Sequence, residues 1–157
     1  MAEALPTDAT AANGAVLITG CSDGGIGSSL AKEFQSRGFH VFATARTITK
    51  MAALEGIPNI TLLELDVTSA TSINAAVVVV SEKANGKLNY LVNNAGWSQT
   101  LPILDTDIEK AKSMYDVNVW GMVAMTKAFA SLVIAAKGSI VNIGSTTGRA
   151  YIPYLGE

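Results

Sequence analysis

The stretch TGCSDGGIG, at residues 19–27, most limits the folds that this chain can adopt. It stands between an apolar run at residues 15–19 and a segment in which apolar residues recur at helical spacing. Glycines in a strand–turn–helix context let the backbone turn tightly and approach a pyrophosphate, and the first helical turn offers free N–H groups to the phosphates. The stretch therefore predicts a nucleotide-binding turn, with a purely structural turn as the alternative.

Short apolar runs alternate with helix-period segments along the rest of the chain, a pattern typical of β-α-β units around a parallel sheet. We expect strands at residues 15–19, 40–44, 60–65, 88–92 and 139–143. We expect helices from residue 26 to a stop at Gly38, at about 50–54, from about 71 to about 86, and at about 106–136. The predicted fold is a Rossmann-type, doubly wound α/β domain that is truncated after five strands.

Length and composition are those of one folded domain: 157 residues, 49% hydrophobic and 15% charged. Residues 1–14 are small and polar, so we expect a disordered tail there and a dinucleotide-binding domain over residues 15–157. A net charge of −2 gives no electrostatic support for binding nucleic acid or an anionic membrane. The longest apolar run, AAVVVV, is too short to span a bilayer. We also expect no metal site. The single cysteine, Cys21, fits a reducing compartment, so we expect a cytoplasmic protein.

The segment after the second expected strand, FATARTITK, carries Arg46 and Lys50 and no acidic residue. An NAD site places Asp or Glu there to accept from the ribose 2′-OH, whereas a guanidinium suits a 2′-phosphate. A charge-assisted contact of this kind contributes about 1.5–3 kcal/mol. A solvated surface arginine is the simpler alternative. The segment favours NADP(H) over NAD(H).

Polar turns follow the third and fourth expected strands: LDVT, which contains Asp66 and Val67, and NNAG at residues 93–96. Ligands of open α/β sheets lie at the carboxyl ends of the strands, so we expect these turns to meet the glycine-rich turn. Asp66 either caps the turn that follows it or hydrogen-bonds an adenine edge, and both readings stay open. Cys21 is expected to be a small loop residue rather than a nucleophile, because no base is near it in sequence.

Five motifs in order resemble the short-chain dehydrogenase/reductase family: the glycine-rich turn, DVT at 66–68, NNAG at 93–96, VNVWG at 117–121 and GSIVNIGS at 138–145. The resemblance covers the chain after residue 14. Four residues separate Gly20 from Gly25, where the family pattern has three. With FATAR following, this form is similar to the fungal acyldihydroxyacetone-phosphate reductase-like branch.

The resemblance implies a cofactor site and part of a catalytic site. Its cofactor-binding residues would be Gly20, Ser22, Gly25, Ile26, Gly27, Arg46, Asp66, Val67, Asn93, Ala95 and Gly96. Asn118 would hold a water of the proton relay, and Ser145 would hydrogen-bond the substrate carbonyl. Without the resemblance, Asn118 is a polar residue in an apolar helix and Ser145 is a strand-end hydroxyl.

In this family, the proton donor is a tyrosine followed four residues later by a lysine, whose charge lowers the phenol pKa from about 10 toward working pH. Tyr151 and Tyr154 follow Ser145, but position 155 is Leu155 and the sequence ends at Glu157. We therefore expect a chain truncated before the Tyr-x-x-x-Lys motif. Tyr151 and Tyr154 are then loop residues near the cleft, or one of them is a substitute acid.

Two apolar surfaces are expected to need cover. The fifth strand, from Ser139 to Ile143, would be an uncovered edge that invites pairing with another chain. In the family, the long helix packs against a partner subunit. Without such a partner, the large apolar residues of this helix would either face water or belong to the core: Trp120, Met122, Met125 and Phe129. We expect a homo-oligomer, most simply a dimer, through this helix around Trp120 or through the edge strand.

Three functions remain open at this stage. The first is an NADP(H)-dependent oxidoreductase that acts on a ketone or an alcohol as a small-molecule substrate, incomplete in its catalytic tyrosine and lysine. The second is a non-redox enzyme that reuses the scaffold without cofactor turnover. The third is a pseudoenzyme that binds nucleotide or a partner chain without catalysis.

Overall fold

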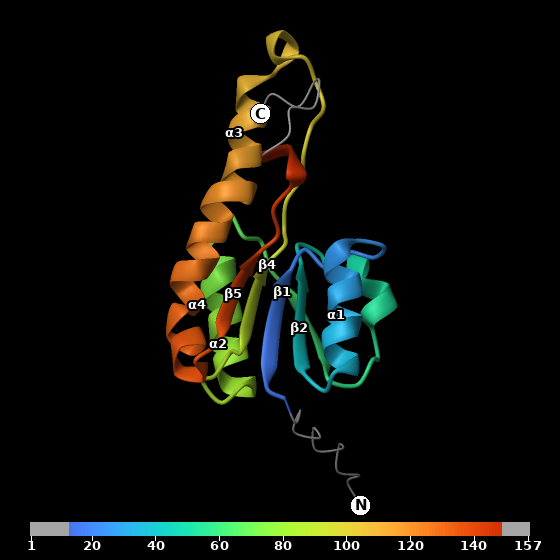
Figure 1. Cartoon of the computed structure of the whole chain (residues 1–157), viewed down its shortest axis with the longest axis vertical. Helices are drawn as coiled ribbons and strands as arrows, with labels where there is room; N and C mark the ends of the chain where they lie inside the picture. Colours follow the sequence, from blue (N-terminus) through green and yellow to red (C-terminus); the bar gives the residue numbers. More distant parts are fainter. Residues whose placement is uncertain (1–12, 149–157) are drawn as a thin grey trace, which may run out of the picture.

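The computed structural model describes residues 13–148. These residues form one parallel sheet with helices on its faces (Figure 1). The strand order is β3-β2-β1-β4-β5. The strands are β1 (Ala15–Thr19), β2 (His40–Ala45), β3 (Ile60–Glu64), β4 (Tyr90–Asn93) and β5 (Ser139–Asn142). The order reverses at β1, which is where ligands bind in doubly wound sheets. The predicted Rossmann-type fold is confirmed.

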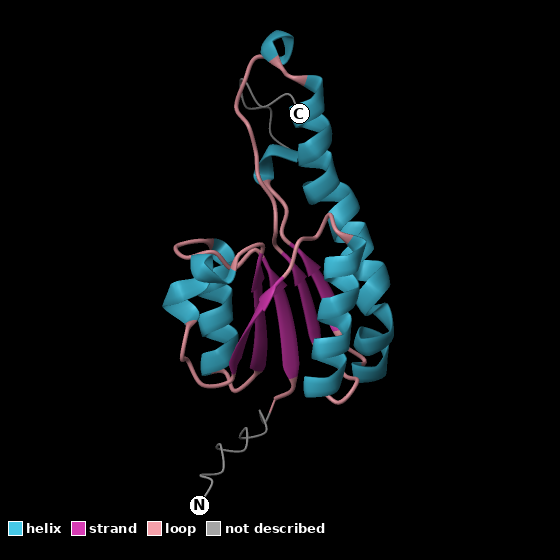
Figure 2. Ribbon diagram, turned by 180° about the vertical axis from the view of Figure 1, so that it is seen from behind, coloured by secondary structure: helices cyan, strands magenta, loops and turns pink. Residues whose placement is uncertain are grey.

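Helical segments cover both faces of the sheet, as Figures 1 and 2 show. On one face, α1 (Ile26–Ser36) and η1 (Ile48–Leu54) enclose a core that contains Val16, Val41 and Met51. On the other face, α2 (Ala70–Lys83) and α4 (Met122–Ala136) enclose a core that contains Phe42, Leu91 and Phe129. Because successive strand residues point to opposite faces, the apolar runs of β1 and β2 supply both cores.

The helix ends follow the local sequence. The α1 helix stops at Ser36, and Gly38 follows with a φ of 79°, a left-handed conformation that suits glycine. The side chain of Ser69 caps α2 by accepting a hydrogen bond from the Ser72 N–H. These ends lie close to the predicted ones.

The predicted helix at about 106–136 is found as three consecutive helical segments: α3 (Ile108–Tyr115), the π-helical η3 (Asp116–Gly121) and α4. It begins two residues later than predicted because Asp107 is the N-cap, its carboxylate accepting from two backbone N–H groups. Gly121 is buried in η3, and a Cβ there would lie 2.7 Å from Val67 Cγ2. The π segment therefore lies directly against the loop that follows β3.

For two residues of α4, the structure selects the core reading of the two that the sequence left open. Met125 and Phe129 are fully buried, because the face of α4 that carries them packs on α2 and the sheet. Trp120 in η3 does face solvent, and Val123 and Ile134 of α4 are also exposed. The helical stretch Ile108–Ala136 is long and apolar enough, by length and composition alone, to cross a membrane. In this fold its C-terminal part, α4, packs on β4 and β5.

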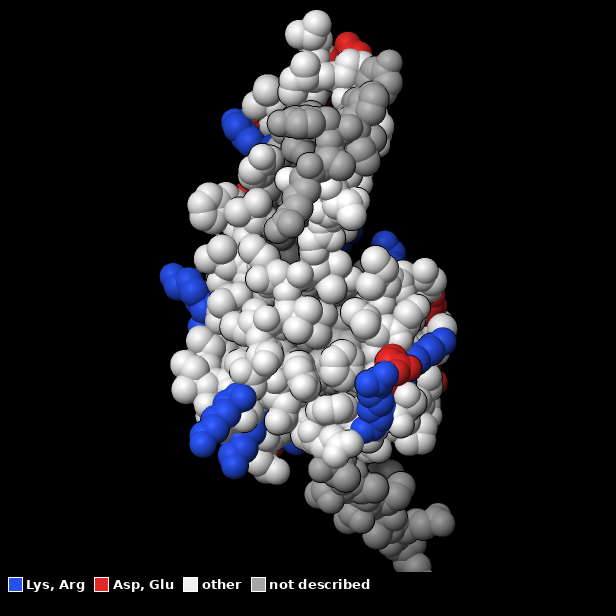
Figure 3. Space-filling model, in the orientation of Figure 1, with Lys and Arg blue, Asp and Glu red and all other residues white. Residues whose placement is uncertain are grey.

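The β5 side of the sheet is the less covered one. All four residues of β5 are exposed, as expected for an edge strand. On the face seen in Figure 3, the charged side chains lie mainly toward the margins, and the surface between them is uncharged. In the same view of Figure 1, β4 and β5 lie on this face without a helix in front of them.

The start of the described chain is joined to the domain. The Asn13 side chain donates to the Arg37 carbonyl oxygen, and the Gly14 carbonyl accepts from the His40 N–H at 2.9 Å. Residues 1–12, the rest of the predicted tail, lie outside the described residues, as do Tyr151 and Tyr154.

Two short 3₁₀ turns complete the described chain, η2 (Ile103–Asp105) and η4 (Thr146–Gly148). Figures 1 and 2 show η2 and α3 projecting well beyond the carboxyl ends of the strands.

Candidate functional site

Two adjoining clefts lie where the strands end. The first has a volume of about 370 Å³ and the second about 320 Å³. They share a common wall made of Val67, Asn94, Ala95, Gly96 and Val117. Most of the predicted cofactor-binding residues line the first cleft: Gly20, Ser22, Gly25, Ile26, Arg46, Asp66, Val67, Ala95 and Gly96.

The glycine-rich turn is packed so closely that two of its glycines have little room for a side chain. Gly20 has a φ of 73°, and a Cβ at Gly27 would lie 2.5 Å from the Gly20 carbonyl oxygen. Gly25 is the N-cap of α1, no side chain caps this end, and the first turn has no acidic residue. The helix therefore presents its N–H groups and the positive end of its dipole to the first cleft, which suits an anion.

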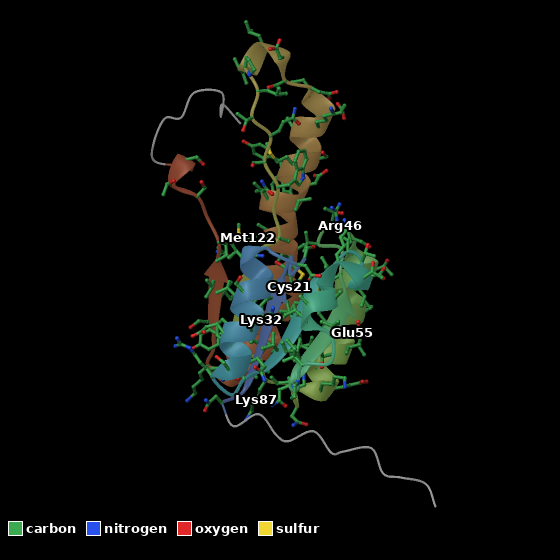
Figure 4. The ribbon with its side chains drawn as sticks, turned by 90° about the vertical axis from the view of Figure 1, so that its right-hand side faces the viewer. Cys21, Lys32, Arg46, Glu55, Lys87 and Met122 are labelled. Atoms are coloured by element: carbon green, nitrogen blue, oxygen red, sulfur yellow. The ribbon has the colours of Figure 1, made fainter. Side chains whose placement is uncertain are left out.

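Arg46 follows β2 directly and lines the first cleft beside Asp66. Figure 4 shows Arg46 at the same end of the sheet as Met122, and Lys87 near the opposite end. The Thr68 N–H donates to Asp66 at 2.9 Å and lowers the pKa of that carboxyl, with further lowering by the Thr68 hydroxyl and the Arg46 charge against partial burial. Asp66 thus caps its turn, which is one of the two readings left open, and it also faces the cleft.

Cys21 lies in the glycine-rich turn but is fully buried. Burial raises the pKa of its thiol to about 12, against the lowering effect of a hydrogen bond with the Thr44 backbone. The thiol lies 3.3 Å from the Ile18 carbonyl oxygen. A thiol this hard to ionise is a poor nucleophile, in agreement with its expected role as a loop residue.

Asn94 was missed among the predicted site residues, although it stands inside the NNAG motif. Its Nδ2 donates to the carbonyl oxygens of Thr19 at 2.7 Å and Gly20 at 3.0 Å. In return, the Thr19 hydroxyl accepts from the N–H groups of Asn94 and Ala95, both at 2.9 Å. These bonds fix the NNAG turn against the glycine-rich turn. The bare Cα of Gly27 leaves the space that the Asn94 amide occupies.

Asn93 points into the protein instead. It is 7% exposed, and its Nδ2 donates to Asn142 Oδ1 at 2.9 Å, which joins β4 to β5. Its Oδ1 is buried and has no hydrogen-bond partner among residues 13–148. Asn93 borders the second cleft rather than the first. Its predicted role on the ribose side stays a prediction.

The structure brings Asn118 and Ser145 to the second cleft. Asn118 uses both ends of its amide on one residue: Oδ1 accepts from the Trp97 N–H at 3.1 Å, and Nδ2 donates to the Trp97 carbonyl at 2.8 Å. The Ser145 Oγ accepts from the Thr147 N–H at 3.2 Å. Asn118 therefore fixes the loop after β4 to η3, and Ser145 adds a hydroxyl to the other wall of the cleft.

Together, the clefts offer two kinds of chemistry. The first combines a helix N-terminus with a guanidinium, a pairing that suits phosphate groups. The second combines a hydroxyl and an amide with apolar side chains, which suits a small molecule with one polar group. Their common wall allows one extended ligand to occupy both clefts.

Comparison with known proteins gives consistent matches. The profile of the family described as short chain dehydrogenase matches residues 14–156. Short-chain dehydrogenase PC-15 of Penicillium crustosum is 49% identical over 141 residues, which are 90% of this chain and 52% of that protein. The NADPH-dependent 1-acyldihydroxyacetone phosphate reductase of Schizosaccharomyces pombe is 45% identical over 139 residues, 88% of this chain and 46% of that protein.

A solved structure also matches. The short-chain dehydrogenase from Burkholderia cenocepacia J2315, in complex with NADP, aligns with a TM-score of 0.80 and 26% identity, over 93% of this chain and 59% of that one. The chain spans about half the length of the two fungal relatives that it matches.

Proposed function

The chain belongs to the short-chain dehydrogenase family, and from that premise we propose that it binds NADP(H) and serves in the oxidation of an alcohol or the reduction of a ketone. The observation that carries the proposal is the pairing of Arg46 with the uncapped N-terminus of α1 in one cleft. The helix end would hold the pyrophosphate, and the guanidinium would hold the 2′-phosphate.

Two comparisons support this choice of cofactor. The Schizosaccharomyces pombe relative is named as NADPH-dependent, and the Burkholderia cenocepacia structure contains NADP. No acidic residue stands directly after β2, where Arg46 is followed by Thr47, so the position that would favour NAD(H) is not occupied by a carboxylate.

When bound, the nicotinamide group would supply or accept a hydride. Ser145 is proposed to donate a hydrogen bond to the substrate oxygen, and Asn118 to hold the water that relays a proton. Tyr151 and Tyr154 are the proposed candidates for an acid, and both lie outside the described residues. The small volume of the second cleft, about 320 Å³, favours a small carbonyl or alcohol substrate.

We further propose that the protein is cytoplasmic and that a second copy covers its exposed apolar surface. The exposed residues of this surface come from η3, α4 and β5: Trp120, Val123, Ile134, Ile140 and Val141. Exposed large apolar residues are more frequent at subunit interfaces than on the rest of a protein surface.

The test is a titration of the purified chain with NADPH and with NADH. Trp97 borders the first cleft, so quenching of tryptophan emission reports binding directly. Arg46→Ala should weaken NADPH binding about 10- to 100-fold, as expected when a charge-assisted phosphate contact is lost, and should leave NADH binding unchanged.

Arg37→Ala is the control, because Arg37 is also an exposed arginine but lies at the far end of α1, where it pairs with Glu33. Equal loss in both variants would mean that Arg46 acts only through overall charge. Turnover of a substrate without cofactor would favour the non-redox alternative, and cofactor binding without turnover would favour the pseudoenzyme.

A further inference from the structure

We propose that Asp23 is a positioning residue for the 2′-phosphate of the cofactor: it holds the segment after β2 so that Arg46 faces the first cleft. This inference rests on the proposed binding of NADP(H). It assigns a purpose to the longer spacing of the glycine-rich turn, in which four residues separate Gly20 from Gly25.

The residues at the tip of the turn point away from the cleft. Asp23 and Gly24 are exposed, and neither borders the first cleft, although Ser22 and Gly25 on either side of them do. Gly24 has a φ of 75°, and a Cβ there would meet no atom within 4 Å. The left-handed conformation at Gly24 therefore turns the chain outward without contact with the phosphate-binding part of the turn.

Asp23 is hydrogen-bonded to η1 at two residues. Its backbone N–H donates to the Lys50 carbonyl oxygen at 2.7 Å. Its carboxylate accepts from the Ala53 N–H, at 3.1 Å to Oδ1 and 3.3 Å to Oδ2. One residue of the glycine-rich turn thus holds a segment that is 30 positions later in the sequence.

One further backbone hydrogen bond connects Lys50, which Asp23 contacts, to the residue next to Arg46. The Lys50 N–H donates to the Thr47 carbonyl oxygen at 3.1 Å, and Thr47 is the residue next to Arg46. Arg46 itself is exposed, so its own packing does little to fix it. Asp23 therefore ties the backbone that carries the guanidinium to the backbone that would carry the pyrophosphate.

The charge of Asp23 makes the proposal sharply testable. A carboxylate near a phosphate opposes binding by like-charge repulsion, so its simple removal should strengthen NADPH binding. A positioning role predicts the opposite, because loss of the carboxylate frees η1 at Ala53. The two accounts differ in sign.

The experiment measures Kd for NADPH and NADH with the wild-type chain, Asp23→Ala and Asp23→Asn. Asp23→Ala should weaken NADPH binding about tenfold, the effect of one displaced charge-assisted contact, and should leave NADH binding within about twofold. Asp23→Asn keeps an acceptor for the Ala53 N–H but loses the charge, so it should bind NADPH at least as well as the wild type.

Asp107→Ala is the matched control. Asp107 is also an exposed aspartate whose carboxylate accepts from two backbone N–H groups, those of Glu109 and Lys110, but it lies at the start of α3. Both alanine variants lose carboxylate hydrogen bonds to backbone N–H groups, from one N–H at Asp23 and from two at Asp107. A change in the NADPH-to-NADH preference in Asp23→Ala alone therefore supports positioning. An equal change in both variants, or stronger NADPH binding by Asp23→Ala, overturns it.

A second measurement tests the route through Arg46. In an Arg46→Ala background, Asp23→Ala should have no further effect on NADPH affinity, whereas additive losses would contradict the proposal. Failure of the cofactor proposal looks different: the wild-type chain itself would then show no preference for NADPH.

Discussion

The two edge strands of the sheet lie in different surroundings. β3 has η1 and α2 against it, and four of its five residues are half-buried. β5 contacts α4 on one face, and all four of its residues are exposed. Both strands mix apolar and polar residues, ITLLE in β3 and SIVN in β5, so composition alone does not separate them.

The difference lies in what covers each face. In parallel pairs, register partners point to the same face, so Val141 lies on the side of Val92 and Ile140 on the side of Leu91. Val92 packs in the core under α1 and η1, and these two segments contact β1, β2 and β3. Val141 remains 37% exposed, because α1 and η1 do not extend over β5. Burial in this fold thus depends on crossover helices more than on the strand sequence.

The largest expected contrast is in thiol reactivity. Cys21 is enclosed in the covered half, where its pKa is raised to about 12, and a cysteine at position 141 would stand on the uncovered face. At pH 8, the variant Cys21→Ala/Val141→Cys should react with iodoacetamide about a thousandfold faster than wild-type Cys21, since three pKa units change the thiolate fraction about tenfold each.

Labelling of Cys21 should also stay slow through pH 9, where an ordinary thiol ionises, because its folded state keeps the proton until about pH 12. Mass spectrometry of both proteins gives the rates. Fast labelling of native Cys21 would mean that the glycine-rich turn opens readily, and the two halves would then not differ as described.

The next contrast is in stability. Phe42 in β2 is fully buried, and Phe42→Ala should lower the free energy of unfolding by about 3–5 kcal/mol. Ile140 in β5 is 38% exposed, so Ile140→Ala should cost only about 1 kcal/mol. Urea denaturation measures both values. Equal losses would show that β5 is covered in solution.

The smallest effect is expected for a charge on the uncovered face. Val141→Lys should change the free energy of unfolding of the monomer by no more than about 0.5 kcal/mol, because its side chain reaches solvent. It should also weaken self-association in light scattering if a second copy covers β5. Glu64→Lys is the control, because it places a lysine at an exposed position of the other edge strand, β3. It should leave self-association unchanged.

Most of the fold was predictable because its signals are local. The apolar runs, Gly38 after α1 and the residues around Ser69 are read from neighbouring positions. The observed elements begin and end within about three residues of the predictions. The glycine-rich turn, Arg46 and the NNAG turn were likewise expected to meet, since parallel strands end on one side of the sheet.

The alternatives that the sequence left open, and the residues that it missed, concern contacts between distant residues. The burial of Met125 depends on where α4 lies against α2, which its nearly uniform apolar sequence does not reveal. Asn94 was missed because its neighbour Asn93 has the same side chain and only the backbone direction tells which one faces the glycine-rich turn. The π-helical segment η3 and the hydrogen bonds from Asp23 to η1 could not be predicted, because the residues next to them in sequence show no pattern that indicates them.

The outward tip of the glycine-rich turn also bears on how such chains are recognised. Asp23 and Gly24 lengthen the loop on its solvent side, while Gly20 and Gly27 keep their contacts beneath it. A sequence pattern that requires a fixed number of residues between the glycines would pass over this chain, even though its helix end is presented in the usual way. In this chain, the two residues at the tip thus add length to the turn without lining the cleft.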